Sequence, residues 1–269
     1  MTKADGNVSK FYNSVGWESH GDNTEDALRF EDLRDCASEY VSLCRLRVLE
    51  HIPGEGVNLL DMASGPIQYE EYLQFSKNFK KRYCVDLSSK ALDLAKEKIG
   101  THGEFLHGNF LDMELKDNFF DCSISLHTIY HIDQGLQESA VRKLLAVTKA
   151  GSPVIIIYSN PDNLLSWLGS LVRSLKHRFS RNGDSSQLAK SEHDLYFFTH
   201  SLGWWNRFED VAKAEMHPWR SLASHHQKKL IPDNLLGRKM LGILYSMESR
   251  FPNFFVKNFQ YYIIILRKL

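Results

Sequence analysis

Short apolar segments alternate with longer amphipathic segments along most of the chain. The short segments are rich in Val, Ile, Leu and Tyr and predict buried strands, whereas the amphipathic segments have the apolar spacing of helices. Strands that alternate with helices favour a parallel sheet with helices on both faces. We therefore predict a doubly wound, mostly parallel α/β sheet of seven strands, at residues 57–61, 82–86, 104–107, 120–126, 153–159, 211–217 and 259–266.

The same pattern divides the chain into parts. The alternation stops after Pro161 and resumes near Ser201, after a polar stretch rich in Ser, Asn and Gly. Helices are predicted over about 24–50, with Thr24 as N-cap, from Pro66, from Ser88, and over 134–149, 201–209 and 235–250. We expect four parts: an N-terminal helical lid with its helix (1–56), a core (57–161), a helical cap insert (162–200), and the C-terminal part of the core (201–269) with a helical insert at 223–251.

Composition narrows the class of protein. The 269 residues are 43% hydrophobic, which is enough for a large core. Lys and Arg together number 33, as do Asp and Glu, so the overall charge gives no attraction to nucleic acid or to anionic membranes. The four cysteines lack Cys-x-x-Cys spacing, the first ten residues are polar, and no apolar run reaches membrane-spanning length. We expect a cytoplasmic protein with reduced cysteines and no nucleic-acid partner.

Acidic side chains end two consecutive predicted strands. The first strand runs into Asp61 and a loop of small residues, Ala63-Ser64-Gly65, before a helix is expected. The second strand ends at Asp86. Ligands of open parallel sheets bind at the carboxyl ends of the strands, beside helix N-termini. An acid after the second strand commonly accepts hydrogen bonds from ribose hydroxyls, so the sequence predicts a nucleoside-type cofactor.

The loop and its surroundings resemble the class I S-adenosylmethionine-dependent methyltransferases, over about residues 57–161 and more weakly to residue 269. The family's loop reads acid-x-Gly-x-Gly-x-Gly, and the matching positions here are Asp61, Ala63, Gly65 and Ile67. Two of the three glycines are therefore replaced. Glycines let the backbone approach a pyrophosphate closely, but S-adenosylmethionine carries an amino-acid tail and no phosphate. The loop thus favours S-adenosylmethionine over a dinucleotide, on the Rossmann-like methyltransferase fold that the resemblance implies.

The resemblance also implies which residues would contact the cofactor. Asp61 would orient the loop or bind the methionine ammonium, and Asp86 would bind the ribose hydroxyls. Asn109 stands where the family usually has an acid for the adenine amino group, and its amide oxygen can serve instead. The other expected contacts are Ala63, Ser64 and Gly65 in the loop, Leu87 and Phe110 beside the adenine ring, Leu126 after the fourth strand, and Tyr12 and Trp17 in the lid, unless these two aromatic residues only pack against the first helix.

Two histidines follow the fourth predicted strand, beside the place where the resemblance puts the transferable methyl group. We expect His127 or His131 to act as general base, because a neutral imidazole can take a proton from a hydroxyl or an ammonium near pH 7. Asp133 would either orient His131 or cap helix 134–149. The alternative is that each ring only bonds to backbone or packs beneath the cofactor. No histidine spacing indicates a metal site.

The acceptor is less sharply defined than the cofactor. We expect a methyltransferase acting on O or N of a small molecule such as a sugar or a polyketide, with the aromatic residues between Tyr196 and Trp205 forming either acceptor walls or core. Residues 164–181 predict an amphipathic helix with a basic end, which would be a cap, a homodimer interface or a peripheral membrane contact. The last case would change the acceptor to a prenylated quinone or another lipid. A non-catalytic cofactor-binding scaffold is the remaining alternative.

Overall fold

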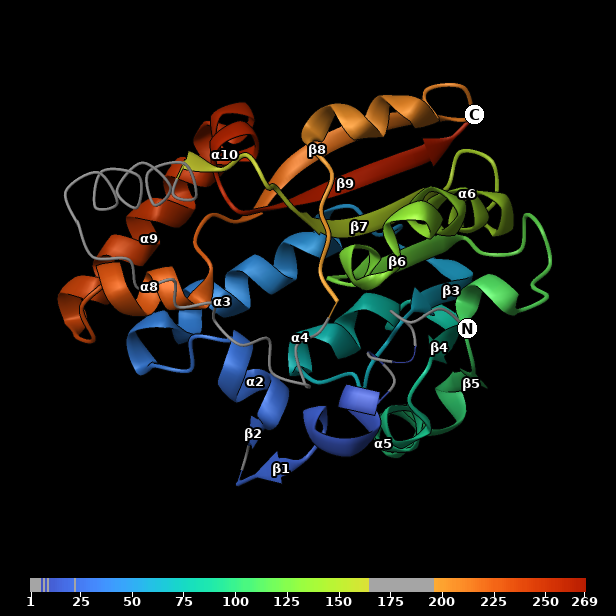
Figure 1. Ribbon diagram of the computed structural model, residues 1–269, viewed down its shortest axis with the longest axis horizontal. Helices are drawn as coiled ribbons and strands as arrows, with labels where there is room; N and C mark the ends of the chain where they lie inside the picture. Colours follow the sequence, from blue (N-terminus) through green and yellow to red (C-terminus); the bar gives the residue numbers. More distant parts are fainter. Residues whose placement is uncertain (1–5, 7, 9, 22, 165–195) are drawn as a thin grey trace, which may run out of the picture.

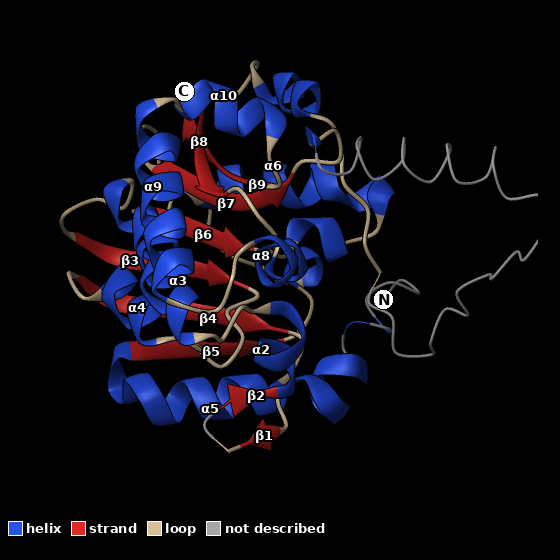
Figure 2. Cartoon of the chain, turned by 90° about the vertical axis from the view of Figure 1, so that its left-hand side faces the viewer, coloured by secondary structure: helices blue, strands red, loops and turns tan. Residues whose placement is uncertain are grey.

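The computed structural model covers residues 1–269 and describes all of them except 1–5, 7, 9, 22 and 165–195. Its centre is one seven-stranded sheet with helices packed on both faces (Figures 1 and 2). The order of strands across the sheet is β5-β4-β3-β6-β7-β9-β8. Their bounds are β3 (Gly56–Met62), β4 (Phe79–Asp86), β5 (Gly103–His107), β6 (Cys122–Leu126), β7 (Pro153–Ser159), β8 (Ala212–Arg220) and β9 (Tyr261–Lys268).

The sheet is mostly parallel, as predicted. The neighbours from β5 to β7 pair in parallel, and β9 pairs antiparallel with both β7 and β8. From β3 the chain builds outward through β4 to β5, and it then returns to place β6 on the other side of β3. Such a reversal opens a crevice at the carboxyl ends of the central strands, where ligands bind in sheets of this kind.

Helices and short helical turns connect the strands. The α-helices among the described residues are α2 (Glu25–Phe30), α3 (Asp35–Leu46), α4 (Glu70–Leu73), α5 (Ser89–Ile99), α6 (Gln137–Val147), α8 (Ser224–Leu230), α9 (Leu235–Arg250) and α10 (Pro252–Asn258). The shorter turns are η1 (Tyr12–Gly16), η2 (Arg47–Glu50), η3 (Gln74–Ser76), η4 (Gly100–His102), η5 (Phe110–Asp112), η6 (Ile129–His131), η7 (Gln134–Leu136) and η8 (Leu202–Phe208). A two-stranded ribbon, β1 (Ser19–His20) with β2 (Asn23–Thr24), precedes α2.

Both faces of the sheet are buried. Leu60 and Ile156 belong to a core with α6 and Trp205, whereas Leu59 and Ile155 point into a second core with Phe75. Successive strand residues face opposite sides, so a strand covered on both faces is apolar throughout. This explains the continuous apolar runs that marked the strands in the sequence.

The prediction of one continuous helix over 24–50 is wrong. Thr24 does cap α2, accepting a hydrogen bond from the Ala27 N–H at 3.3 Å. The helix then stops at Phe30, and Glu31 has an extended backbone. Glu31 turns to meet Arg220 at 2.6 Å, an ion pair with a residue 189 positions away. A tertiary contact, invisible to helical periodicity, therefore divides the segment into α2 and α3.

Other predicted helices begin late or change type. The helix expected from Pro66 begins only at Glu70, because Ile67 has a positive φ of 50° that no α-helix accommodates. The segment 201–209 is a 3-10 helix, and 134–149 starts as one before α6 begins. Ser88 caps α5 as predicted, with the Ala91 N–H donating to its hydroxyl at 3.2 Å.

The remaining expectations about the whole chain have mixed outcomes. All four cysteines are buried and free of disulfides, as expected for reduced core residues. Among the helices that the structure describes, none combines the length and the apolar character that a membrane span needs. The helix predicted over 164–181 lies, after Leu164, outside the described residues.

Candidate functional site

A large cavity lies at the carboxyl ends of β3, β4, β5 and β6. Its volume is about 1340 Å³. All thirteen residues that the sequence put forward as cofactor contacts or bases line it: Tyr12, Trp17, Asp61, Ala63, Ser64, Gly65, Asp86, Leu87, Asn109, Phe110, Leu126, His127 and His131. These residues come from five separate segments, so the fold assembles in one place what the strand ends suggested.

The loop after β3 has an unusual backbone. Ala63, Gly65 and Ile67 have φ values of 56°, 56° and 50°, all in the left-handed region. These are the three positions at which the methyltransferase loop usually has glycine. Left-handed backbone costs a residue with a Cβ about 1 to 2 kcal/mol. The chain thus keeps the glycine geometry without two of the glycines, and the buried Ile67 side chain packs with Cys84, Leu92 and Ala95.

Asp61 forms a buried ion pair behind the loop. Its Oδ2 accepts the Arg82 Nε–H at 3.0 Å, and both side chains are almost fully buried. Arg82 also donates to the Tyr72 carbonyl at 2.6 Å. Asp61 therefore ties β3 to β4 and holds the start of the loop in place.

Asp86 meets only backbone donors among the described residues. The Gly65 N–H donates to one of its oxygens at 2.8 Å, and the Ser88 N–H donates to the other at 2.8 Å. Burial raises the pKa of Asp86 to about 6, against the lowering effect of these two hydrogen bonds. Each carboxylate oxygen can accept a second hydrogen bond. The carboxylate thus fixes the loop and keeps acceptor capacity toward the cavity.

The N-terminal aromatic residues reach the loop. A Cβ placed on Gly65 would lie 3.2 Å from the Trp17 ring, so the indole rests against this glycine. Tyr12 stacks on Trp17, with ring centroids 4.8 Å apart. Its hydroxyl donates to Asp26 Oδ1 of α2 at 3.3 Å. The two rings therefore pack on the loop and on α2 at once.

His131 has a defined tautomer. Its Nδ1 lies 2.6 Å from the Tyr196 backbone carbonyl oxygen, which can only accept a hydrogen bond. Nδ1 therefore carries the proton, and Nε2 of the neutral ring is an acceptor. Burial lowers the pKa of His131 to about 4, so the ring is neutral near pH 7. Asp133 accepts the Gly135 N–H at 3.0 Å and caps η7, so of its two predicted roles the cap is the one observed.

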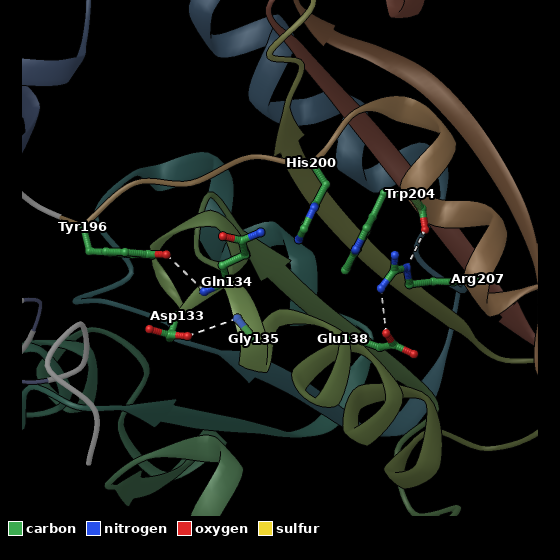
Figure 3. A pocket seen from close by; sticks show the side chains of 8 residues that line it. All are labelled: Asp133, Gln134, Gly135, Glu138, Tyr196, His200, Trp204 and Arg207. Atoms are coloured by element: carbon green, nitrogen blue, oxygen red, sulfur yellow. Dashed lines mark hydrogen bonds and ion pairs between the residues drawn. The ribbon is translucent and has the colours of Figure 1, made fainter.

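Tyr196 is itself held in place, and Figure 3 shows its hydroxyl bonded to Gln134 from the side of a neighbouring pocket. This pocket has a volume of about 580 Å³ and shares Asp133 and Tyr196 with the large cavity. The Tyr196 hydroxyl accepts the Gln134 N–H at 3.1 Å, and the Phe198 N–H donates to the Tyr130 carbonyl at 2.8 Å. The segment after residue 195 is thus fastened over η6 and η7.

His127 is packed more tightly than His131. Its Nδ1 lies 2.8 Å from the Tyr130 hydroxyl, and its ring packs edge-on against Trp219 at 4.3 Å between centroids. The residue has a φ of 59°, and burial lowers the pKa of its ring well below the ordinary value. His127 therefore lines the cavity as a neutral ring fixed by aromatic neighbours.

Solved structures with this arrangement are methyltransferases. An S-adenosylmethionine-dependent methyltransferase from Archaeoglobus fulgidus is 16% identical, with 86% of this chain and 94% of that chain covered at a TM-score of 0.50. Geranyl diphosphate C-methyltransferase from Streptomyces coelicolor A3(2) is 14% identical, with 100% and 98% covered at 0.58. Phosphoethanolamine N-methyltransferase 2 from Haemonchus contortus is 14% identical, with 83% and 52% covered at 0.51. At these identities the likeness establishes the fold alone.

A family-level match adds to the fold. Residues 60–156, which run from β3 into β7, match the model of a family described as methyltransferase domain. Residues 60–156 are therefore similar to a methyltransferase domain, on a fold that S-adenosylmethionine-dependent methyltransferases share. A comparison with curated proteins finds no significant match. Two of the solved structures hold S-adenosylhomocysteine or S-adenosylmethionine, and S-adenosylmethionine is the cofactor that the loop after β3 predicts for this chain.

Several cavity residues escaped the sequence analysis. They come from the N-terminal segment, from the loop before α4 and from the C-terminal strands, and include Asp26, Glu31, Tyr69, Arg220 and Tyr261. In the sequence Asp26 stands in the first turn of the predicted helix 24–50, where acidic residues are common for reasons of the helix dipole alone. No periodicity reveals that a side chain on α2 faces a cavity shared with β8 and β9. In the described part of the chain, no group of three or more His, Cys, Asp or Glu side chains could hold a metal ion.

Proposed function

We propose that this methyltransferase transfers the methyl group of S-adenosylmethionine to an oxygen or nitrogen of a small-molecule acceptor. The observation that carries the proposal is the continuity of the cavity. The same space is lined by Gly65 and Asp86 at one end and by His127, His131 and Phe197 at the other. Ligand pockets commonly have volumes of about 300 to 1000 Å³, so a cavity of about 1340 Å³ suits a cofactor together with an acceptor.

The cofactor half of the cavity fits S-adenosylmethionine. Asp86 keeps acceptor capacity for the ribose hydroxyls, and the backbone of Ala63, Ser64 and Gly65 would face the methionine tail. Asp61 would act through Arg82 by orienting the loop. Leu87, Asn109, Phe110 and Leu126 would surround the adenosine, and Tyr12 and Trp17 would cover the methionine part. When bound, the cofactor supplies an electrophilic methyl group on a sulfonium.

The side-chain oxygen of Asn109, the proposed acceptor for the adenine amino group, already has one hydrogen-bond partner. Its side-chain oxygen already accepts the Leu111 N–H at 3.0 Å and caps η5. Amide oxygens have two lone pairs, so a second hydrogen bond from an adenine amino group is compatible with the cap. We retain Asn109 as a proposed adenine contact on that basis.

His131 is the proposed general base. With Nδ1–H donated to the Tyr196 carbonyl, the Nε2 lone pair is the side of the ring that can take a proton from the acceptor. The same carbonyl would stabilise the imidazolium that forms. His127, fixed by Tyr130 and Trp219, is the proposed wall beside the reacting atoms. Since methyl transfer is an in-line displacement, the other task of these groups is to orient the nucleophile.

The acceptor class rests on the aromatic wall and on the absence of any described feature that favours a larger partner. Tyr130, Tyr196, Phe197 and Tyr261 would surround a metabolite-sized acceptor. The names of two structural relatives indicate acceptors of that size, geranyl diphosphate and phosphoethanolamine. No contact within the described ranges favours the lipid alternative, which depends on residues 164–181.

Replacing the proposed base tests the function. In His131→Gln we expect methyl transfer to fall by about 100-fold or more, because general bases typically contribute factors of that size. Transfer is measured as S-adenosylhomocysteine released across a panel of hydroxyl and amine acceptors. His102→Gln is the matched control, since His102 bonds to Ser76 away from the cavity.

Binding measurements separate catalysis from structure in the same experiment. S-adenosylhomocysteine should bind His131→Gln within about twofold of the native affinity, because His131 stands at the acceptor end. Full activity in His131→Gln would remove this residue from the mechanism. Failure of the native chain to bind S-adenosylhomocysteine at all would overturn the proposed cavity assignment.

A further inference from the structure

We propose that Asp26, together with Tyr12, forms a binding site for an onium cation on the lid side of the cavity. The cation would be the sulfonium of the cofactor or an ammonium of the acceptor, which share the chemistry that a carboxylate and an aromatic face recognise. The inference rests on the proposed function, because it assumes that cofactor and acceptor share this cavity. It assigns a role to a residue that neither the sequence nor the family resemblance put forward.

Asp26 is linked to the loop after β3 through two aromatic side chains. Its carboxylate lines the cavity and accepts the Tyr12 hydroxyl at 3.3 Å. Tyr12 stacks on Trp17, which rests on Gly65. A second link fastens α2 to the loop, because Gln68 Nε2 donates to Thr24 Oγ1, the cap of α2, at 2.5 Å. Asp26 is therefore carried on an element that is attached to the cofactor site at two points.

The charges around the cavity are balanced except at three carboxylates. Five carboxylates line it, and one of them, Asp133, accepts the Gly135 N–H. Glu31 pairs with Arg220, and Asp61 pairs with Arg82. Asp86 accepts two backbone N–H groups, and Asp26 accepts only the Tyr12 hydroxyl among the described residues.

Arg29, the cation nearest in sequence to Asp26, is engaged elsewhere. Its Nε–H donates to Glu25 at 2.6 Å. Glu31, which follows α2, repels the Asp26 carboxylate and raises its pKa. The groups that face the Asp26–Tyr12 pair are thus Arg29, Glu31, and the more distant Asp86 and Tyr69 that act on Tyr12. Arg29 attracts the Asp26 carboxylate and lowers its pKa, but its ion pair is with Glu25 and it forms none with Asp26.

A bound cation would supply the missing compensation. Burial raises the pKa of Asp26 to about 7, despite the hydrogen bond from Tyr12. A neutral hydroxyl on a ligand could bond to this carboxylate but would leave its charge uncompensated in a partly buried site. An onium group compensates the charge and also suits the aromatic faces of the surrounding wall, which includes Tyr12, Tyr69 and Tyr130. The cavity is therefore suited to a cation at this end.

The two forms of the cofactor offer a direct probe. S-adenosylmethionine carries the sulfonium charge, whereas the sulfur of S-adenosylhomocysteine is neutral. Because burial raises the pKa of Asp26 to about 7, binding of a cation beside it near pH 7 should release a fraction of a proton. Binding of the neutral product analogue should release none at this site. The difference between the two ligands isolates the charge, because everything else in them except the methyl group is shared.

The first arm of the experiment measures both ligands by calorimetry in buffers of different ionisation enthalpy, at pH 7 and pH 8. We expect Asp26→Asn to weaken S-adenosylmethionine about tenfold at pH 8 and to abolish its proton release. S-adenosylhomocysteine should stay within about twofold, which also shows that the variant is folded. Glu39→Gln removes an exposed charge from α3 and does not line the cavity, so it should change neither ligand.

The second arm tests the ammonium. Choline and its neutral carbon isostere 3,3-dimethylbutan-1-ol are titrated into the protein saturated with S-adenosylhomocysteine. If the site serves the acceptor, choline should bind about tenfold better than the isostere, and Asp26→Asn should remove that preference. Tyr12→Phe should reduce it by a smaller factor, because the ring face remains while the hydrogen bond to Asp26 is lost.

The outcomes are separable. Dependence on Asp26 in the first arm assigns the site to the sulfonium, and dependence in the second arm assigns it to the acceptor. If neither ligand pair responds to Asp26→Asn while S-adenosylhomocysteine binds normally, the cation site is refuted and the proposed function stands. If S-adenosylhomocysteine fails to bind the native chain, it is the proposed function that fails.

Discussion

The ends of β3 and β4 look alike in the sequence and differ in the structure. Each strand ends in an aspartate, and both residues were predicted to contact the cofactor. Asp61 is bound to the guanidinium of Arg82 in a buried ion pair, whereas Asp86 meets only the N–H groups of Gly65 and Ser88 among the described residues. An acid at a strand end is thus a ligand candidate only when no cation of the protein has already neutralised it.

The alternation of strand side chains explains the difference. Arg82 lies two residues before the β4 residue paired with Asp61, on the same face of the sheet, so its long side chain reaches Asp61 diagonally. Asp86 lies beyond that reach, at the last residue of β4. It therefore projects toward the cavity, with the loop backbone as its partner. The comparison predicts that one aspartate serves stability and the other serves binding.

The largest expected effect is on stability at Asp61. Asp61→Asn should lower the free energy of unfolding by about 3 to 5 kcal/mol, because it leaves the Arg82 charge buried without a counter-ion. Urea denaturation measures this. The double variant Asp61→Leu with Arg82→Met should recover most of the loss, since apolar replacements of a buried pair are often tolerated. A stable Asp61→Asn that binds S-adenosylmethionine weakly would reverse the roles we assign to the two strand ends.

The next effect is on binding at Asp86. Asp86→Ala should weaken S-adenosylmethionine and S-adenosylhomocysteine at least tenfold, about 1.4 kcal/mol, through loss of the ribose contact. The affinities for the two ligands should fall by the same factor, because the ribose is common to them. Calorimetry at pH 7 measures the two affinities. Unchanged affinity in a folded variant would contradict the ribose assignment.

The pH dependence of stability sharpens the result at Asp86. Its pKa is raised to about 6 in the folded protein, above the ordinary value of 3.8, so the folded state holds the proton more tightly than the unfolded state. This contribution to the free energy of unfolding is therefore present below about pH 4 and is lost as the pH rises through 6. Asp86→Asn lacks it, and its stability relative to the native chain should improve between pH 4 and pH 7 in parallel urea titrations.

The smallest effect concerns the strained loop that joins the two strand ends. Ala63 has a φ of 56°, which glycine adopts without cost. Ala63→Gly should raise the free energy of unfolding by about 1 kcal/mol, less the entropy that glycine gains in the unfolded chain. Ala91→Gly, in the helical backbone of α5, should do the opposite. If both substitutions destabilise equally, the left-handed backbone at Ala63 carries no measurable strain.

Much of the site could be predicted because it depends on local order along the chain. The parallel strands, their acidic ends and the loop of small residues occur in sequence, and the fold places consecutive strand ends together. Asp26 and Arg220 could not be predicted as neighbours of this site, because they reach the cavity only through the packing of α2 and β8. The division of helix 24–50 was unpredictable for the same reason, since Glu31 meets Arg220 across 189 residues.

The sequence by itself determined the sheet, and it carried the resemblance that predicts the methyl donor. Buried parallel strands need continuous apolar runs, and such runs can be recognised in short stretches of sequence. A cofactor that lacks phosphate tolerates the loss of two glycines, which is also visible within one short loop. The tertiary structure decided which charges are free to act. Asp61, Glu31, Asp86 and Asp26 are all carboxylates in the sequence, and only the positions of Arg82 and Arg220 neutralise the first two. Electrostatic partnership depends on distances of a few ångströms between remote segments, and these distances exist only in the folded chain.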